Sequence, residues 1–152
     1  MRSTGSRTLF AKAVAAPRTV TRKRVLFVCI GNMCRSPMAE FFARCYGSDV
    51  LEAASAGLMP GPVSDSRITK VMAEKGIALG DHFPKGLDEL EAAEWDLAVN
   101  MSGLLMPKLG RAEIREWAVR DPYQMAEPVY REVRDEIEQR VMSLILELRR
   151  QR

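Results

Sequence analysis

A cysteine and an arginine with five residues between them are the pair in this chain whose types and spacing suggest covalent chemistry. Cys29 ends an apolar run, and Arg35 is followed by Ser36 and Pro37, so a tight loop joins a strand to a helix. The backbone N–H groups of such a loop, together with the dipole of the helix, attract an anion. The same groups favour a thiolate at Cys29, and the planar guanidinium of Arg35 suits two phosphate oxygens. The loop therefore predicts a nucleophile that handles phosphate.

The segments on either side of this loop are predicted from their apolar patterns. Val25–Ile30 is a continuous run of apolar, mostly β-forming residues, which indicates a buried parallel strand. Ser36 suits the N-cap of the following helix, and Pro37 suits its first position. We expect this helix over Pro37–Tyr46, with Cys45 on the apolar face that packs into the core.

The rest of the chain alternates between strand and helix patterns. Further strands are predicted at Leu51–Ala56, Trp95–Asn100 and Arg115–Val119, and helices at Ser64–Lys75, Leu87–Ala93, Ser102–Leu109 and Glu127–Leu148. This alternation predicts an α/β fold, a three-layer sandwich with a central four-stranded parallel sheet. Ligands of such folds lie beyond the carboxyl ends of the strands. Because Cys29 and Asp121 follow the first and fourth predicted strands, we expect both at the same edge of the sheet.

Composition excludes several classes of protein. The length of 152 residues fits one domain, and no apolar run approaches the roughly 20 residues that span a bilayer. Three cysteines, two of them in one loop, do not form a secreted disulfide framework, which favours a reducing, cytoplasmic location. With one histidine and no ligand cluster at metal spacing, we expect no metal and no cofactor.

The first 24 residues differ in charge from the rest. They hold seven of the 23 basic side chains and none of the 20 acidic ones, so the remaining chain is mildly acidic and offers no nucleic-acid face. Their composition is compatible with an organelle transit peptide, a disordered basic arm or a mis-assigned start. On each interpretation residues 1–24 are an extension outside the fold, and residues 25–152 form the domain.

Two motifs carry a resemblance to a known family. Residues 28–40, which read Val-Cys-Ile-Gly-Asn-Met-Cys-Arg-Ser-Pro-Met-Ala-Glu, resemble the signature of the low-molecular-weight protein tyrosine phosphatases, in particular bacterial members. Residues 120–123, Arg-Asp-Pro-Tyr, resemble the second motif of this family, at the same order and distance. The resemblance covers roughly residues 25–150 and implies a flavodoxin-like, phosphotyrosine phosphatase I-like fold.

The resemblance implies a role for each residue of the two motifs. Cys29 would be the nucleophile that forms a phosphocysteine, Arg35 would bind the phosphate, and Asp121 would protonate the leaving phenolate and later activate water. Tyr123 would be an aromatic wall for a phenyl ring. The loop residues that would surround the phosphate are Ile30, Gly31, Asn32, Met33, Cys34, Arg35 and Ser36.

Other positions would support this loop or depart from the family. In the family a hydrogen-bond network holds this loop in shape, and the residues here that resemble its members are Asn32, Ser36, Ser55 and His82. Cys34 is either a partner for a reversible disulfide with Cys29 or a small buried thiol. The loop after Ser55-Ala-Gly lacks the tryptophan of many eukaryotic members, and Ser102 stands where the family often has a supporting carboxylate.

The sequence favours a phosphatase acting on a phosphotyrosine protein or a small aryl phosphate, as a monomer or weak homo-oligomer without nucleic acid or membrane partners. An arsenate reductase on the same scaffold is one alternative. It would need further cysteines, expected between about residues 80 and 100, where the chain has none. A phosphate-binding module without catalysis is another, although Cys29, Arg35 and Asp121 are all present.

Overall fold

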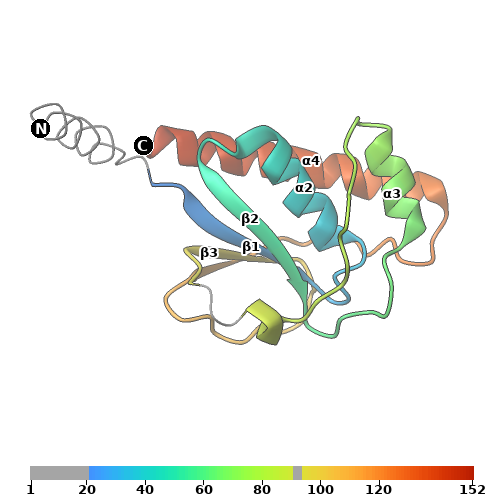
Figure 1. Ribbon diagram of the computed structural model, residues 1–152, viewed down its shortest axis with the longest axis horizontal. Coiled ribbons are helices and arrows are strands. Elements are labelled where there is room, and N and C mark those ends of the chain that lie inside the picture. Colours follow the sequence, from blue (N-terminus) through green and yellow to red (C-terminus); the bar gives the residue numbers. More distant parts are fainter. Residues whose placement is uncertain (1–20, 91–93) are drawn as a thin grey trace, which may run out of the picture.

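The computed structural model describes residues 21–90 and 94–152, which form four strands and four helical elements (Figure 1). The strands are β1 (Lys23–Cys29), β2 (Leu51–Gly57), β3 (Leu97–Asn100) and β4 (Glu113–Glu116). The α-helices are α2 (Arg35–Gly47), α3 (Ser66–Ala73) and α4 (Glu127–Arg150), and η1 (Leu87–Leu90) is a short 3-10 helix.

The sheet places the end of β1 at its centre. All neighbouring strands are parallel, in the order β2-β1-β3-β4, so β2 and β3 lie on opposite sides of β1. The chain therefore winds in one direction from β1 to β2 and in the other from β1 to β3. Crevices at such a switch point are the usual ligand sites of parallel α/β sheets. Cys29 is the last residue of β1 and lies at this point.

Alternate residues of β1 separate the two faces of the sheet. Val25 and Phe27 pack in the main core with side chains of α2, α3 and α4, all of which cover one face (Figure 1). Leu26 and Val28 point to the other face, where η1 and the loops around Trp95 and Leu109 cover them. The expected α/β fold with a four-stranded parallel sheet is confirmed, and in the described ranges η1 is the helical element of the second face.

Element boundaries differ from the sequence predictions in small ways. The first strand begins at Lys23 instead of Val25 and the third at Leu97 instead of Trp95, and the fourth spans Glu113–Glu116 instead of Arg115–Val119. The helix predicted over Leu87–Ala93 is a 3-10 turn at Leu87–Leu90, and its remaining residues 91–93 lie outside the described part.

Two predictions about α2 were wrong. The N-cap position is Cys34, without a side-chain cap, because the Ser36 hydroxyl is occupied elsewhere. Cys45 is exposed instead of lying in the core. Gly47, at the end of α2, packs closely against α4: a Cβ added there would lie 2.6 Å from Ile145.

The helix predicted over Ser102–Leu109 was also wrong, because this segment is irregular. Gly103 and Gly110 adopt left-handed backbone angles, with φ of 76° and 54°. The side chain of Asn100 binds the backbone at residues 102 and 104, which offers the chain an alternative to helical hydrogen bonds. No helix among the described residues is long and apolar enough to cross a membrane.

Candidate active site

The loop from Cys29 to Arg35 holds its carbonyl groups outward and leaves its amides free. Three of its carbonyls, those of residues 29, 30 and 31, accept hydrogen bonds of 2.8–3.1 Å from the backbone N–H groups of residues 58, 59 and 61. Within the described ranges no backbone N–H of residues 30–36 donates to a protein acceptor. Consecutive free N–H groups at the start of a helix form a site for an anion. The loop is thus shaped for an oxyanion.

Asn32 fixes the conformation of this loop. Its backbone is left-handed, with φ of 56°, which asparagine tolerates better than most residues. The buried side chain donates from Nδ2 to the hydroxyls of Ser36 and Ser55, at 2.9 Å each, and accepts the backbone N–H of Lys85 at 3.0 Å. His82 donates from Nε2 to the Asn32 carbonyl at 3.0 Å. All four polar groups suggested by the sequence as loop support therefore meet at one point.

The end of β2 approaches the loop so closely that only glycine fits. A Cβ at Gly57 would lie 2.7 Å from the carbonyl oxygen of Ile30 and 2.8 Å from the amide nitrogen of Asn32. Because both neighbours are backbone atoms, they cannot move aside without deforming the loop. Gly57 thus contributes to the shape of the site through the absence of a side chain.

The sulfur of Cys29 has a defined polar partner. It lies 2.9 Å from the hydroxyl oxygen of Ser36, and both residues are buried. Since the Asn32 amide already donates to this oxygen, the Ser36 hydroxyl is free to donate its own hydrogen to the sulfur. A hydroxyl that donates to sulfur stabilises a negative charge there. The geometry therefore suits a sulfur that alternates between thiolate and covalent adduct.

Arg35 connects the loop to the segments that follow β3 and β4. Its guanidinium is buried and donates from Nη1 to the carbonyls of Met101 and Val119, the latter at 3.0 Å. Nη2 lies 3.4 Å from a carboxylate oxygen of Asp121. The segments after β3 and β4 therefore orient the guanidinium beside the loop and bring Asp121 to the same place.

Sequence reasoning missed the hydrogen bonds that order the segment after β3. The Asn100 amide donates to the Glu116 carboxylate at 3.0 Å and to the carbonyl of Leu104 at 2.9 Å. Its oxygen accepts the hydroxyl of Ser102 at 2.6 Å. Glu116 on β4 thus supplies a carboxylate to the segment that holds Arg35 through Met101, although Ser102 carries none. The residue types gave no signal for this pairing.

Cys34 belongs to a second network that the sequence did not indicate. Its sulfur donates to Asp65 at 3.4 Å, and the same carboxylate oxygen accepts the hydroxyl of Tyr130 at 2.5 Å. The pKa of the Cys34 thiol is raised mainly by burial, and further by the negative charge of Asp65 and by the hydrogen bond between Cys34 and Asp65. Cys34 is therefore held as a neutral thiol, and Cys29 and Cys34 are both free in this structure.

A buried carboxylate and a neutral imidazole complete the support of the loop. Glu40 accepts the Ser55 hydroxyl at 2.5 Å and pairs with Arg44 one turn along α2. Burial lowers the pKa of His82, whose ring stands edge-on to Phe41 at 6.2 Å between centroids. An imidazole that donates to a carbonyl while uncharged orients the loop and does not act as a base at this position.

The remaining predicted site residues lie at the mouth of the loop. Ile30, Gly31 and Met33 are partly buried, and Tyr123 is exposed in the turn where its N–H donates to the Asp121 carboxylate at 3.1 Å. No group of three potential ligands for a metal occurs in the described part of the chain.

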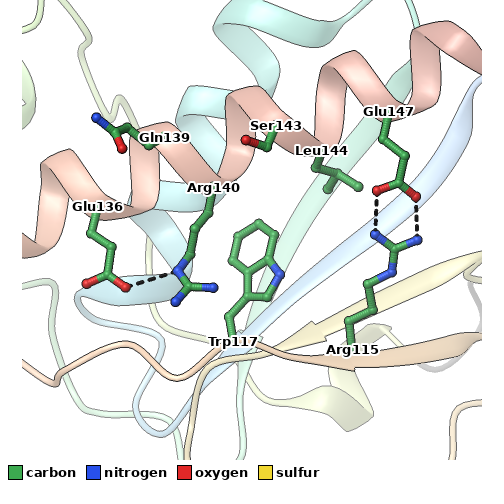
Figure 2. A pocket seen from close by; sticks show the side chains of 8 residues that line it. All are labelled: Arg115, Trp117, Glu136, Gln139, Arg140, Ser143, Leu144 and Glu147. Atoms are coloured by element: carbon green, nitrogen blue, oxygen red, sulfur yellow. Dashed lines mark hydrogen bonds and ion pairs between the residues drawn. The ribbon is translucent and has the colours of Figure 1, made fainter.

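A separate groove of about 440 Å³ lies between β4 and α4 and shares no residue with this loop. Figure 2 shows that its charged side chains already pair with each other, Arg115 with Glu147 and Arg140 with Glu136. These four side chains therefore offer no unpaired charge to a ligand in this groove.

Comparisons with known proteins agree with this geometry. Residues 24–152 match the family model described as low molecular weight phosphotyrosine protein phosphatase. A glutaredoxin arsenate reductase of Synechocystis sp. is 33% identical over 130 residues, which cover 83% of this chain and 98% of that protein. A solved arsenate reductase in the phosphate-binding state superimposes with a TM-score of 0.75 at 28% identity and covers 83% of this chain and 98% of its own.

A solved phosphatase is similarly close. The low-molecular-weight protein tyrosine phosphatase of T. tengcongensis has a TM-score of 0.68 at 30% identity, over 82% of this chain and 99% of that one. The resemblance of the two motifs is therefore confirmed at the level of the whole domain. The chain belongs to the low-molecular-weight phosphotyrosine protein phosphatase family, whose cysteine-based enzymes include phosphatases and arsenate reductases.

Proposed function

We propose that this protein hydrolyses aryl phosphate monoesters, with phosphotyrosine in a protein as its substrate class, through a phosphocysteine intermediate. In the first step the Cys29 thiolate attacks phosphorus and the bond from phosphorus to the aryl oxygen breaks. Asp121 gives its proton to the departing phenolate. The free amides of residues 30–36 and the Arg35 guanidinium hold the three remaining phosphate oxygens.

In the second step water replaces the cysteine. The Asp121 carboxylate takes a proton from a water molecule, whose oxygen attacks the phosphorus. The bond between sulfur and phosphorus breaks, and the thiolate is released next to the Ser36 hydroxyl. Inorganic phosphate leaves with Asp121 protonated for the next cycle. The cycle uses only groups of this chain and water, so it needs no cofactor.

One observation carries this proposal: the carboxylate of Asp121 lies 3.4 Å from the guanidinium of Arg35. Hydrolysis of an aryl phosphate needs an acid on the leaving-group side of the phosphate in addition to a nucleophile and an oxyanion site. The contact brings such an acid from the segment after β4 to the loop that contains Cys29. Pro122 restricts the backbone of Asp121 to extended conformations, which favours a carboxylate that projects over the loop.

Arsenate reduction is a second candidate, because a relative at 33% identity is named an arsenate reductase. Reduction forms a disulfide that a chain of further cysteines passes outward. Here the two other cysteines are Cys34, which is buried against Asp65, and Cys45, which is exposed on α2. Neither lies in the segment between residues 80 and 100 where a relay cysteine is expected, and this weighs against reduction.

A paired assay tests the proposal. The purified protein is incubated with para-nitrophenyl phosphate and, separately, with arsenate and either glutaredoxin or thioredoxin in a coupled reduction assay. We expect release of phosphate and no arsenate-dependent oxidation of the reductant. Cys29→Ser should abolish phosphate release and still bind phosphate, whereas the matched variant Cys45→Ser should retain full activity. Arsenate turnover without hydrolysis of the aryl phosphate by the folded protein would replace the phosphatase with the reductase.

A further inference from the structure

Exposed large apolar side chains are concentrated around the Cys29 loop. Eight such side chains occur in the described residues, and seven lie on segments that border the site, while Leu146 lies on α4. The seven are Met59, Val63, Phe83, Leu104, Leu105, Tyr123 and Met125. Apolar side chains that gather at one place on a surface mark a site of contact with another molecule. This clustering therefore points to a binding surface, whereas single apolar residues scattered over the surface would not.

Each of these segments is tied to the catalytic groups by a hydrogen bond or a short stretch of chain. The N–H of Met59 donates to the carbonyl of Ile30 at 2.8 Å, and the N–H of Tyr123 donates to Asp121 at 3.1 Å. Leu104 and Leu105 follow Met101, whose carbonyl accepts a hydrogen bond from Arg35. The apolar side chains thus border the place where a phosphorylated residue would enter.

Two of the segments, residues 57–64 and 101–107, are here called the apolar loops. They follow β2 and β3, which lie on opposite sides of β1, so they flank the Cys29 loop from both sides. An extended polypeptide that places a side chain on the sulfur would therefore meet one apolar loop before that residue and the other after it.

The charges of the apolar loops indicate what kind of polypeptide fits. Neither residues 57–64 nor residues 101–107 contain a charged side chain. Acidic or basic residues of a substrate that packed against these two loops would lose water without gaining a partner of opposite charge from them. Apolar residues would instead bury surface against leucine and methionine, which favours binding.

Leu105 is held ready for such a contact. Its side chain is 97% exposed. The turn that carries it is fixed by bonds from Asn100 to the carbonyl of Leu104 at 2.9 Å and from the Leu104 N–H to the Ser102 hydroxyl at 3.0 Å. A side chain on an ordered turn loses little conformational freedom when it binds, so more of the apolar gain remains as affinity.

We propose that the apolar loops form a docking surface for uncharged, apolar residues on both sides of the phosphotyrosine in a protein substrate, with Leu105 at the centre of one side. This inference rests on the proposed phosphatase function and specifies its substrate. The protein selects its substrates by apolar sequence context as well as by the phosphoaryl group.

Three phosphopeptides that differ only beside the phosphotyrosine test this selection. Leucine, serine or glutamate occupies the flanking positions, and para-nitrophenyl phosphate serves as the reference without flanks. We expect kcat/KM for the leucine peptide to exceed that for the serine peptide by about 10-fold, mainly through KM, since partial burial of one leucine contributes about 1.4 kcal/mol. The glutamate peptide should be the poorest of the three.

A matched pair of variants assigns the effect to the loop. Leu105→Ser should reduce the ratio of kcat/KM for the leucine peptide to that for para-nitrophenyl phosphate by about 10-fold. Leu146→Ser, the same substitution at a leucine that is 47% exposed on α4, should leave this ratio unchanged. Equal kcat/KM values for the three peptides, or equal effects of the two variants, would overturn the inference.

Failure of the docking surface and failure of the proposed function give different results. If the protein does not hydrolyse para-nitrophenyl phosphate at all, the proposed function fails and the docking inference falls with it. If it hydrolyses this compound but shows no preference for the leucine peptide, only the docking inference fails. Sedimentation of the wild type as a dimer that Leu105→Ser converts to a monomer would assign the surface to a second copy of the chain and overturn the proposal.

Discussion

The hydroxyl oxygen of Ser36 lies 2.9 Å from the sulfur of Cys29, and the amide of Asn32 donates to the same oxygen at the same distance. The Ser36 hydroxyl hydrogen has two acceptors within reach, the sulfur at 2.9 Å and the carbonyl of Ala56 at 3.5 Å, and the sulfur is the nearer of the two. This relationship sets the Ser36 hydroxyl to stabilise a thiolate each time the sulfur is released from a phosphoryl group.

Ser36→Ala should therefore slow the second step of the proposed reaction more than the first. A hydrogen bond to a charged group contributes about 1.5–3 kcal/mol, which corresponds to about 10- to 100-fold in rate. Rapid-mixing experiments with para-nitrophenyl phosphate should show a burst of nitrophenol followed by a slow steady state, with phosphoenzyme trapped by acid. Ser48→Ala, at an exposed position after α2, is the control. A variant with wild-type turnover and no burst would contradict the role of the hydroxyl.

Asp121→Asn should reduce turnover according to the leaving group. The amide keeps the shape of the carboxylate beside Arg35 but carries no proton for the leaving phenolate. General acid catalysis is worth about 10²–10⁴-fold. We expect a loss near the upper limit for phenyl phosphate, whose leaving group is basic, and a smaller loss for para-nitrophenyl phosphate. The measurement is kcat/KM across a series of substituted phenyl phosphates, because kcat/KM reports the step in which the leaving group departs and not the later hydrolysis of the phosphocysteine. An equal loss for every member would exclude proton donation by Asp121.

The four parallel strands and the position of the Cys29 loop were predictable because their signals are local. An apolar run that stops at Gly31-Asn32, followed by Ser36-Pro37, marks a strand, a loop and a helix within a few residues. The failed helix at Ser102–Leu109 shows the limit of this reasoning. Side-chain bonds from Asn100 to the backbone decide that segment, and their effect depends on where β4 places Glu116.

Contacts between distant segments were not predictable from residue types. Arg35 is oriented by the carbonyls of Met101 and Val119. Because every residue carries a backbone carbonyl, the sequence does not show which of them will accept these hydrogen bonds. The pairing of Cys34 with Asp65 joins α2 to the N-cap of α3, and it depends on how α3 and α4 pack. The motif therefore identified the reactive groups, whereas the groups that orient them follow from tertiary structure.

Asp65→Asn should make Cys34 more acidic. Burial and the Asp65 carboxylate together raise the pKa of this thiol, so replacing the carboxylate with a neutral amide removes the electrostatic part and lowers the pKa. Asparagine also caps helices well, so α3 keeps its N-cap. In a Cys29→Ser/Cys45→Ser background, the ultraviolet absorbance of the single remaining thiolate is followed against pH.

The matched control for this titration is Asp81→Asn, which neutralises an exposed carboxylate that is not among the groups acting on Cys34. The thiolate should appear at lower pH in Asp65→Asn than in the control. With Cys29 restored, we propose that the same change speeds the formation of a Cys29–Cys34 disulfide by peroxide, because Cys34 is then more often ionised. Superimposable titrations of the two variants would show that burial alone raises the pKa of the Cys34 thiol.

The stability of the fold should depend on pH through His82. Burial lowers the pKa of this imidazole below its ordinary value of 6.5, and the neutral ring donates to the carbonyl of Asn32. The unfolded chain therefore binds a proton on His82 at higher pH than the folded protein does, so the free energy of unfolding rises with pH in this window. The contribution is complete above about pH 6.5 and is lost as the pH falls through the lowered value.

Urea unfolding of the wild type and of His82→Gln at a series of pH values measures this effect. Glutamine offers an amide that can donate to the Asn32 carbonyl but does not titrate, so the variant should lack the loss of stability that the wild type shows as the pH falls below about 6.5. Carboxylates contribute equally to both proteins and cancel in the difference. Parallel curves for the two proteins would mean that His82 titrates alike in the folded and unfolded states, and the loop would then owe its shape to Asn32, Ser36 and Ser55 without a neutral imidazole.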